Sequence, residues 1–141
     1  MIDRSYADFA WEQAAALLGI DSPSGFTANA ARWVKNAFES LGCPARITTK
    51  GGVLVELGGK NAGDALFLEA HTDTLGAMVS QIKGNGRLKL TPLGGMSPNN
   101  AEAENVRVYT RSGKIYEGTC QLADASVHVN GNYADTKRTY D

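Results

Sequence analysis

The 141-residue sequence is poor in cysteine and proline, and the cysteine shortage excludes a disulfide-stapled domain. Its two cysteines, Cys43 and Cys120, are far apart and fit neither a metal-binding nor a redox spacing. Because a small secreted domain usually carries more cysteines, we expect two reduced thiols in a cytoplasmic protein.

An excess of basic charge is also missing. The 14 Lys and Arg residues are scattered among 15 Asp and Glu residues, and the formal net charge is −1. Proteins that bind nucleic acids or anionic membranes normally show clustered basic residues. The apolar run AAALLGI, residues 14–20, is too short to cross a bilayer, and MIDRSYADF at the N-terminus lacks the apolar core of a signal peptide. We therefore expect no nucleic-acid partner, no membrane attachment and a cytoplasmic location.

Helical patterns are confined to roughly the first forty residues. Ser5 is a candidate N-cap for a first helix, in which apolar residues recur at helical spacing as far as Gly19. A second helix is expected to begin near Thr27 and to end at Gly42 and Pro44.

Extended patterns follow Pro44 and are separated by turn-forming residues. Gly51-Gly52, Gly84-Asn85-Gly86 and Ser112-Gly113 each lie between two strand-like runs and predict three hairpins. ASVHVN, residues 125–130, is a further strand candidate. The sequence after Leu75 therefore predicts a β-rich region with no helix longer than a turn.

A different strand pattern occurs at ALFL, residues 65–68. Both parities of this run are apolar, which predicts a strand covered on both faces, as in an α/β sheet. Glu69, His71 and Asp73 then follow at a spacing of two. In an extended chain such residues point to the same side, about 6 to 7 Å apart, so His71 and Asp73 can face one centre and Glu69 can join them.

The residue types at this strand end suit a metal. Imidazole is a strong ligand for Zn²⁺, and a carboxylate two residues later can bind the ion too or hold the second ring nitrogen of His71. α/β sheets place ligands at the carboxyl ends of central strands. A histidine at a strand end also occurs as a hydrogen-bonded structural residue, so the three-residue pattern leaves both interpretations open.

Other candidate residues have simpler explanations. His128 lies in the alternating run SVHVN and is interpreted as a strand residue, with a ligand role shared with His71 as the alternative. Pro23-Ser24-Gly25 can hold a nucleophile, but a turn before a helix explains it better, because no base partner is visible in the sequence. There is no Gly-x-Ser-x-Gly elbow, phosphate loop or Cys-x-x-Cys.

Three segments together resemble a known family. They are PSGF at residues 23–26, LEAHTDTLGAMVSQIKGNGRLKLTPLGG at 68–95 and NVRVYTRSGKIYEGT at 105–119. Their order resembles the dinuclear metallo-aminopeptidases of the glutamyl aminopeptidase type, also called tetrahedral aminopeptidases, over nearly the whole chain. The resemblance implies an α/β fold: residues 1–74 would be the N-terminal part of a zinc-peptidase domain, and residues 75–141 an incomplete, β-rich, barrel-like inserted domain.

The resemblance also implies the chemistry. His71 would be a metal ligand, and Asp73 the catalytic-site carboxylate that orients it. The complete enzyme would hold two divalent ions, zinc or cobalt, bridged by an aspartate, with a glutamate as general base for the water that attacks the peptide. It would release N-terminal residues from peptide substrates and assemble as a homo-oligomer.

The sequence departs from the family pattern in two ways. Position 74 is Thr where many members carry Glu, which bears on substrate preference. No residue matches the bridging aspartate, the catalytic glutamate or the other ligands, and Asp124 and Asp135 are not assigned to these roles. We therefore expect an N-terminal portion that is inactive alone. Because it would expose apolar surface, it should associate, aggregate, or persist only with its complement or another copy.

Two alternatives remain at the level of sequence. Related dinuclear carboxypeptidases and deacylases often read His-Thr-Asp-Thr, but their bridging aspartate follows within a few dozen residues, and residues 91–106 contain no Asp. A non-enzymatic binding or assembly module is the other alternative. In that case Tyr109, Tyr116 and Tyr133 on alternating hairpins would form an interface.

Overall fold

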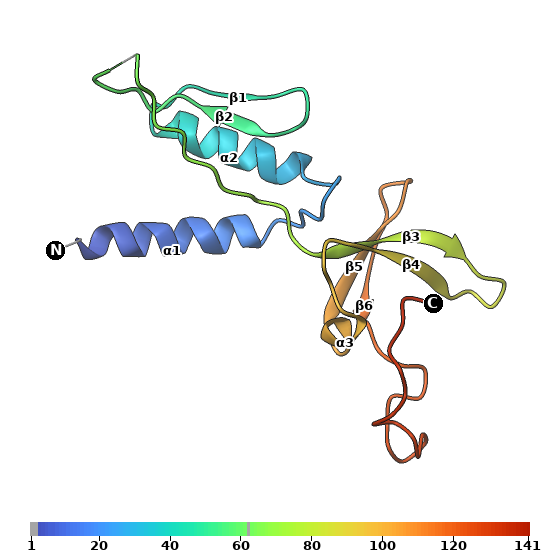
Figure 1. Cartoon of the computed structure of the whole chain (residues 1–141). Helices are drawn as coiled ribbons and strands as arrows, with labels where there is room; N and C mark the ends of the chain where they lie inside the picture. Colours follow the sequence, from blue (N-terminus) through green and yellow to red (C-terminus); the bar gives the residue numbers. More distant parts are fainter. Residues whose placement is uncertain (1–2, 62) are drawn as a thin grey trace. The chain divides into compact units, whose positions relative to one another are not determined.

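The computed structural model describes residues 3–61 and 63–141 and divides them into two compact units (Figure 1). The first unit ends at Leu75 and the second spans Gly76–Asp141. The elements in chain order are α1 (Arg4–Leu18), α2 (Ala28–Ser40), β1 (Ala45–Ile47), β2 (Val53–Val55), β3 (Gly76–Ile82), β4 (Leu88–Leu93), α3 (Pro98–Ala101), β5 (Asn105–Tyr109) and β6 (Ile115–Thr119). The chain is thus a mixed α/β protein with three two-stranded antiparallel sheets.

Both predicted helices are present, and their ends follow local chemistry. The side chain of Asp3, not Ser5, caps α1: its carboxylate accepts a hydrogen bond from the Ser5 backbone N–H at 2.9 Å. The prediction of a Ser5 cap was wrong because the helix begins two residues earlier. The second helix begins near Thr27, as expected, with Thr27 at the N-cap position but without a side-chain capping hydrogen bond. Gly42 takes the left-handed φ of 81° that favours glycine after a helix.

The first unit packs α2 against a short hairpin. β1 pairs with β2 in antiparallel register, Arg46 opposite Leu54, and α2 contacts both strands (Figure 1). In the described part of this unit, full burial reaches only Ala30, Ala31 and Ser22. Most large apolar side chains therefore stay partly or fully exposed, which leaves this unit with a small core.

The predicted strand at residues 65–68 is not formed. Residues 65–70 lie outside helix and strand, and Leu66, Phe67 and Leu68 are between 72% and 84% exposed. A strand exists only when another strand pairs with it, and none of the strands in the described ranges does so here. The prediction of a strand covered on both faces is therefore wrong for this chain, although the run is as apolar as a buried strand requires.

The second unit contains the two other predicted hairpins and, in its described residues, a single one-turn helix. β3 pairs with β4, with an irregularity between Val79 and Gln81, and β5 pairs with β6. α3 is four residues long, as expected from the β-rich pattern after Leu75. Both cysteines are free thiols, as predicted.

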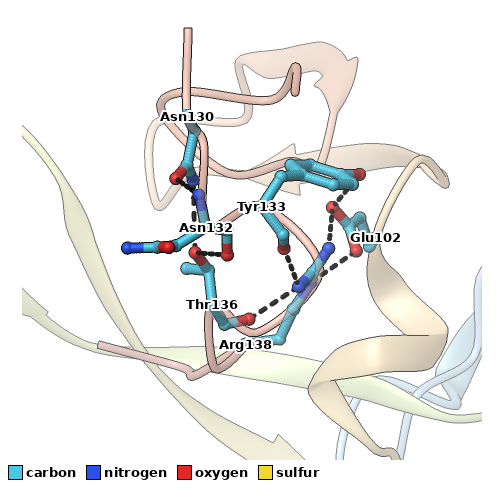
Figure 2. Close-up of polar contacts among 6 residues, drawn as sticks. All are labelled: Glu102, Asn130, Asn132, Tyr133, Thr136 and Arg138. Atoms are coloured by element: carbon cyan, nitrogen blue, oxygen red, sulfur yellow. Dashed lines mark hydrogen bonds and ion pairs between the residues drawn. The ribbon is translucent and has the colours of Figure 1, made fainter. Parts of the chain in front are cut away.

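The last twenty residues form no helix or strand and are held by side-chain contacts and by a hydrogen bond from the Leu90 N–H to the Tyr140 carbonyl at 2.8 Å. Residues 125–130 form turns, so the predicted ASVHVN strand is wrong, and His128 lies exposed in a turn. Figure 2 shows Glu102, Tyr133 and Arg138 meeting. Arg138 Nε and Nη2 donate to the Glu102 carboxylate at 2.6 and 3.1 Å, and the Tyr133 hydroxyl donates to the same group at 2.9 Å. Because Glu102 directly follows α3, this network binds the C-terminal segment to the end of α3.

The network also contributes to how the second unit responds to acid. Hydrogen bonds from Arg138 and Tyr133 lower the pKa of Glu102 below its usual 4.5. A carboxylate with a lowered folded-state pKa contributes stability above the unfolded value and loses it as the pH falls through the folded one. We expect the urea midpoint of this unit, read from the amide NMR signals of residues 126–138, to fall as the pH drops below 4.5.

The matched variants are Glu102→Gln and Glu104→Gln. Glu102→Gln removes the titrating group, so we expect a lower midpoint at neutral pH and a flatter acid response. Glu104 is an exposed neighbour, and its replacement should leave the acid response of the parent chain unchanged. An equal acid response in all three proteins would contradict a stabilising role for the Glu102–Arg138 pair.

Candidate functional site

Residues 22–24 and 72–74, distant in sequence, are joined in the first unit. The buried Ser22 hydroxyl donates to the Thr72 carbonyl at 2.8 Å, and the Thr74 N–H donates to the Ser22 carbonyl at 2.9 Å. Pro23 and Thr74 form an isolated parallel bridge. These contacts hold the His-x-Asp segment from both sides of position 73, although no sheet surrounds it.

A turn places Ser24 beside Asp73. The Phe26 N–H donates to the Pro23 carbonyl at 2.7 Å, and Gly25, third in this turn, has a φ of 87°. Turns with positive φ at the third position require glycine there. The turn interpretation of Pro23-Ser24-Gly25 is therefore confirmed.

His71, Asp73 and Ser24 form a chain of hydrogen bonds. The Nδ1 atom of His71 lies 3.1 Å from Asp73 Oδ1 and 3.1 Å from the Asp73 carbonyl, and the Ser24 hydroxyl donates to Asp73 Oδ2 at 2.6 Å. Both oxygens near Nδ1 are acceptors, so these contacts fit a proton on Nδ1, and in the neutral imidazole that tautomer leaves the lone pair on Nε2. That is the tautomer in which an imidazole can bind a metal through Nε2.

The hydrogen bonds among Ser24, Asp73 and His71 favour an ionised Asp73 carboxylate. The Ser24 hydroxyl, followed by the nearby His71 ring, lowers the pKa of the Asp73 carboxyl below its usual value. Because the serine proton faces the carboxylate and not the imidazole, Ser24 is not activated as a nucleophile. The arrangement is suited to orienting His71, whose side chain is 86% exposed while that of Asp73 is 43% exposed.

The other candidate ligands lie elsewhere. Glu69 is exposed and has no place in the hydrogen-bond chain described above, and His128 belongs to the second unit. Within residues 3–61 and 63–141 no cluster of three or more His, Cys, Asp or Glu side chains can hold a metal ion. The structure thus brings together His71 and Asp73 and adds Ser24, which sequence reasoning had set aside for want of a base partner.

A shallow depression in the second unit is lined by charged side chains, but its arginine already makes hydrogen bonds within the protein. Its lining includes Asn99, Glu102, Asp135, Lys137 and Arg138. Arg138 already donates through Nε and Nη2 to Glu102 and through Nη1 to the carbonyls of residues 133 and 136. These hydrogen bonds engage the guanidinium group within the protein. The hydrogen-bonded residues Ser24, His71 and Asp73 are therefore the stronger candidate for a functional site.

Comparison with known proteins identifies a family for this chain. The family model of the M42 glutamyl aminopeptidases matches residues 51–140, a range that contains both His71 and Asp73. A metallo-aminopeptidase family is therefore the class that the family match shows. The chain belongs to the M42 glutamyl aminopeptidase family.

Individual relatives support the same family over part of their length. The chain is 38% identical over 113 residues to the Bacillus subtilis (strain 168) protein named "Putative aminopeptidase YhfE", covering 80% of this chain and 33% of the relative. It is 30% identical over 105 residues to the glutamyl aminopeptidase of Lactococcus lactis subsp. cremoris (strain MG1363), covering 74% of this chain and 30% of the relative. The chain spans about a third of the length of these curated relatives. Within the described residues, every helix is too short or too polar to serve as a membrane span.

Proposed function

We propose that this chain is part of a metal-dependent aminopeptidase that releases N-terminal residues from peptides. The observation that carries the proposal is the hydrogen-bonded pair His71–Asp73, which lies inside the residues 51–140 that match the family model and is joined by Ser24 from outside that range. The relatives named as aminopeptidases favour the same reaction class. The chain would supply one metal ligand and its orienting carboxylate. The remaining ligands and the general base would come from other parts of a polypeptide of the same length as the relatives.

The residues present fit a metal through their donor chemistry. His71 would hold the ion through Nε2, since Nδ1–H is directed to oxygens of Asp73. Asp73 would hold the ring in one orientation and raise its basicity as a ligand. When bound, a pair of divalent ions, zinc or cobalt, would polarise the peptide carbonyl and activate water.

The two units would have different roles in the complete enzyme. Residues 1–74 would belong to the α/β catalytic domain, and residues 75–141 would be part of a β-rich, barrel-like inserted domain involved in homo-oligomer assembly. The division at Leu75–Gly76 between a unit with two long helices and a unit made mainly of two hairpins supports this assignment. The apolar run at 65–68 would become a central strand once other strands pair with it.

The direct test is turnover of chromogenic amino-acid substrates with and without Zn²⁺ or Co²⁺. We expect no turnover from the 141-residue chain, because His71 alone provides fewer ligands than a dinuclear centre needs. A polypeptide that carries this chain at the length of its relatives should release N-terminal residues only when metal is present. Metal-independent release, or no release of any residue in the panel, would overturn the proposed function.

A further inference from the structure

We propose that Ser24 is a positioning residue that holds Asp73 and thereby sets the tautomer of His71. The proposal rests on the proposed function, since it takes His71 as the ligand being oriented. The contact that suggests it is the 2.6 Å hydrogen bond from the Ser24 hydroxyl to Asp73 Oδ2.

The two oxygens of the carboxylate have different partners. Oδ2 accepts from Ser24, and Oδ1 lies 3.1 Å from His71 Nδ1. A carboxylate can rotate about its last side-chain bond, and a hydrogen bond on one oxygen restrains that rotation. Ser24 therefore keeps Oδ1 directed to the imidazole even though Asp73 is 43% exposed to competing water.

The backbone around Ser24 holds the hydroxyl in place. The Pro23–Thr74 bridge and the Ser22 contacts with Thr72 and Thr74 fix the spacing between the two segments. Gly25 closes the turn with a φ that strains other residues. Because these contacts involve backbone atoms and the Ser22 hydroxyl, removing the Ser24 hydroxyl should leave the joined segments intact.

The test measures the tautomer directly in the ¹⁵N-labelled 141-residue chain. Long-range ¹H–¹⁵N correlation spectra at about pH 8.5, above the usual titration range of histidine, report which nitrogen of His71 carries the proton. In the parent chain we expect the Nδ1–H form to dominate. In Ser24→Ala and Ser24→Val the ratio of Nδ1–H to Nε2–H should fall by about two- to tenfold, the range that one net hydrogen bond represents.

Two further variants separate positioning from packing. Ser24→Thr keeps the hydroxyl and should restore the parent ratio, whereas Val has the same shape without it. Ser40→Ala removes an exposed serine whose hydroxyl bonds only the nearby Ala37 carbonyl, and it should change nothing. A parent-like ratio in the Ala and Val variants, or a Thr variant shifted as far as Val, would overturn the proposal.

The remaining outcomes are also decisive. Loss of the ordered amide spectrum in the Ala and Val variants, with the Thr variant intact, would show that Ser24 maintains the fold and would overturn the positioning role. A tautomer that responds to Ser24, in a protein whose activity survives without His71, would uphold the Ser24 contact and overturn the proposed function instead. The two failures are therefore distinguishable.

Discussion

We expect His71→Ala to lower kcat/KM for N-terminal residue release by about a thousandfold or more, measured in a polypeptide of the same length as the relatives. A metal that polarises a carbonyl contributes several kcal/mol to transition-state stabilisation, and each 1.36 kcal/mol corresponds to about tenfold in rate. The measurement is the rate of chromogenic substrate cleavage at saturating Zn²⁺ or Co²⁺, together with the bound metal per chain.

His128→Ala is the matched control for this experiment. His128 is the other histidine in the sequence, exposed in a turn of the second unit, and its loss should leave both rate and metal content within about twofold of the parent value. Normal turnover in His71→Ala, or equal losses in both variants, would show that the imidazole at position 71 does not hold the metal.

Replacing Leu66, Phe67 and Leu68 together by Ser is expected to suppress self-association of the 141-residue chain. These consecutive side chains are at least 72% exposed in the structure. Each such side chain contributes about 1.5–3 kcal/mol when an interface buries it, so losing one raises a dissociation constant by roughly 10- to 150-fold. Sedimentation velocity over a range of concentrations would show the parent associating and the triple variant remaining monomeric.

A control of similar exposure lies in the second unit. Val127 and Val129 are 63% and 71% exposed but do not form a continuous run, and their replacement by Ser should alter association far less. If the parent chain stays monomeric at high concentration, or if both sets of substitutions act equally, the apolar run at 65–68 is not the associating surface.

Local features of the fold were predictable from the sequence. Both helices and all three hairpins were predicted, because their signals come from residues within a few positions of one another: Thr27 before α2, and Gly51-Gly52 or Ser112-Gly113 between paired strands. The Ser5 cap failed by two residues, since Asp3 also offers a side-chain acceptor and both positions satisfy the same pattern.

Features that depend on distant partners were not predictable in the same way. The ALFL run has the composition of a buried strand, but pairing partners decide whether a strand forms, and its residues alone cannot supply them. At the site, the His71–Asp73 contact followed from a spacing of two. The Ser24–Asp73 contact joins residues 49 positions apart, and only the turn at Pro23–Gly25 hinted that Ser24 was held in a defined place.

The isolated hairpins have a consequence for the order in which the polypeptide acquires its structure. Every strand in the described ranges has one strand neighbour, and that neighbour directly precedes or follows it among the strands in chain order. Such local pairs form within about 1–10 μs and need no help from remote segments. We expect them to exist early, as templates onto which later strands are added, whereas residues 65–70 must wait for partners and are the last part of the first unit to become ordered.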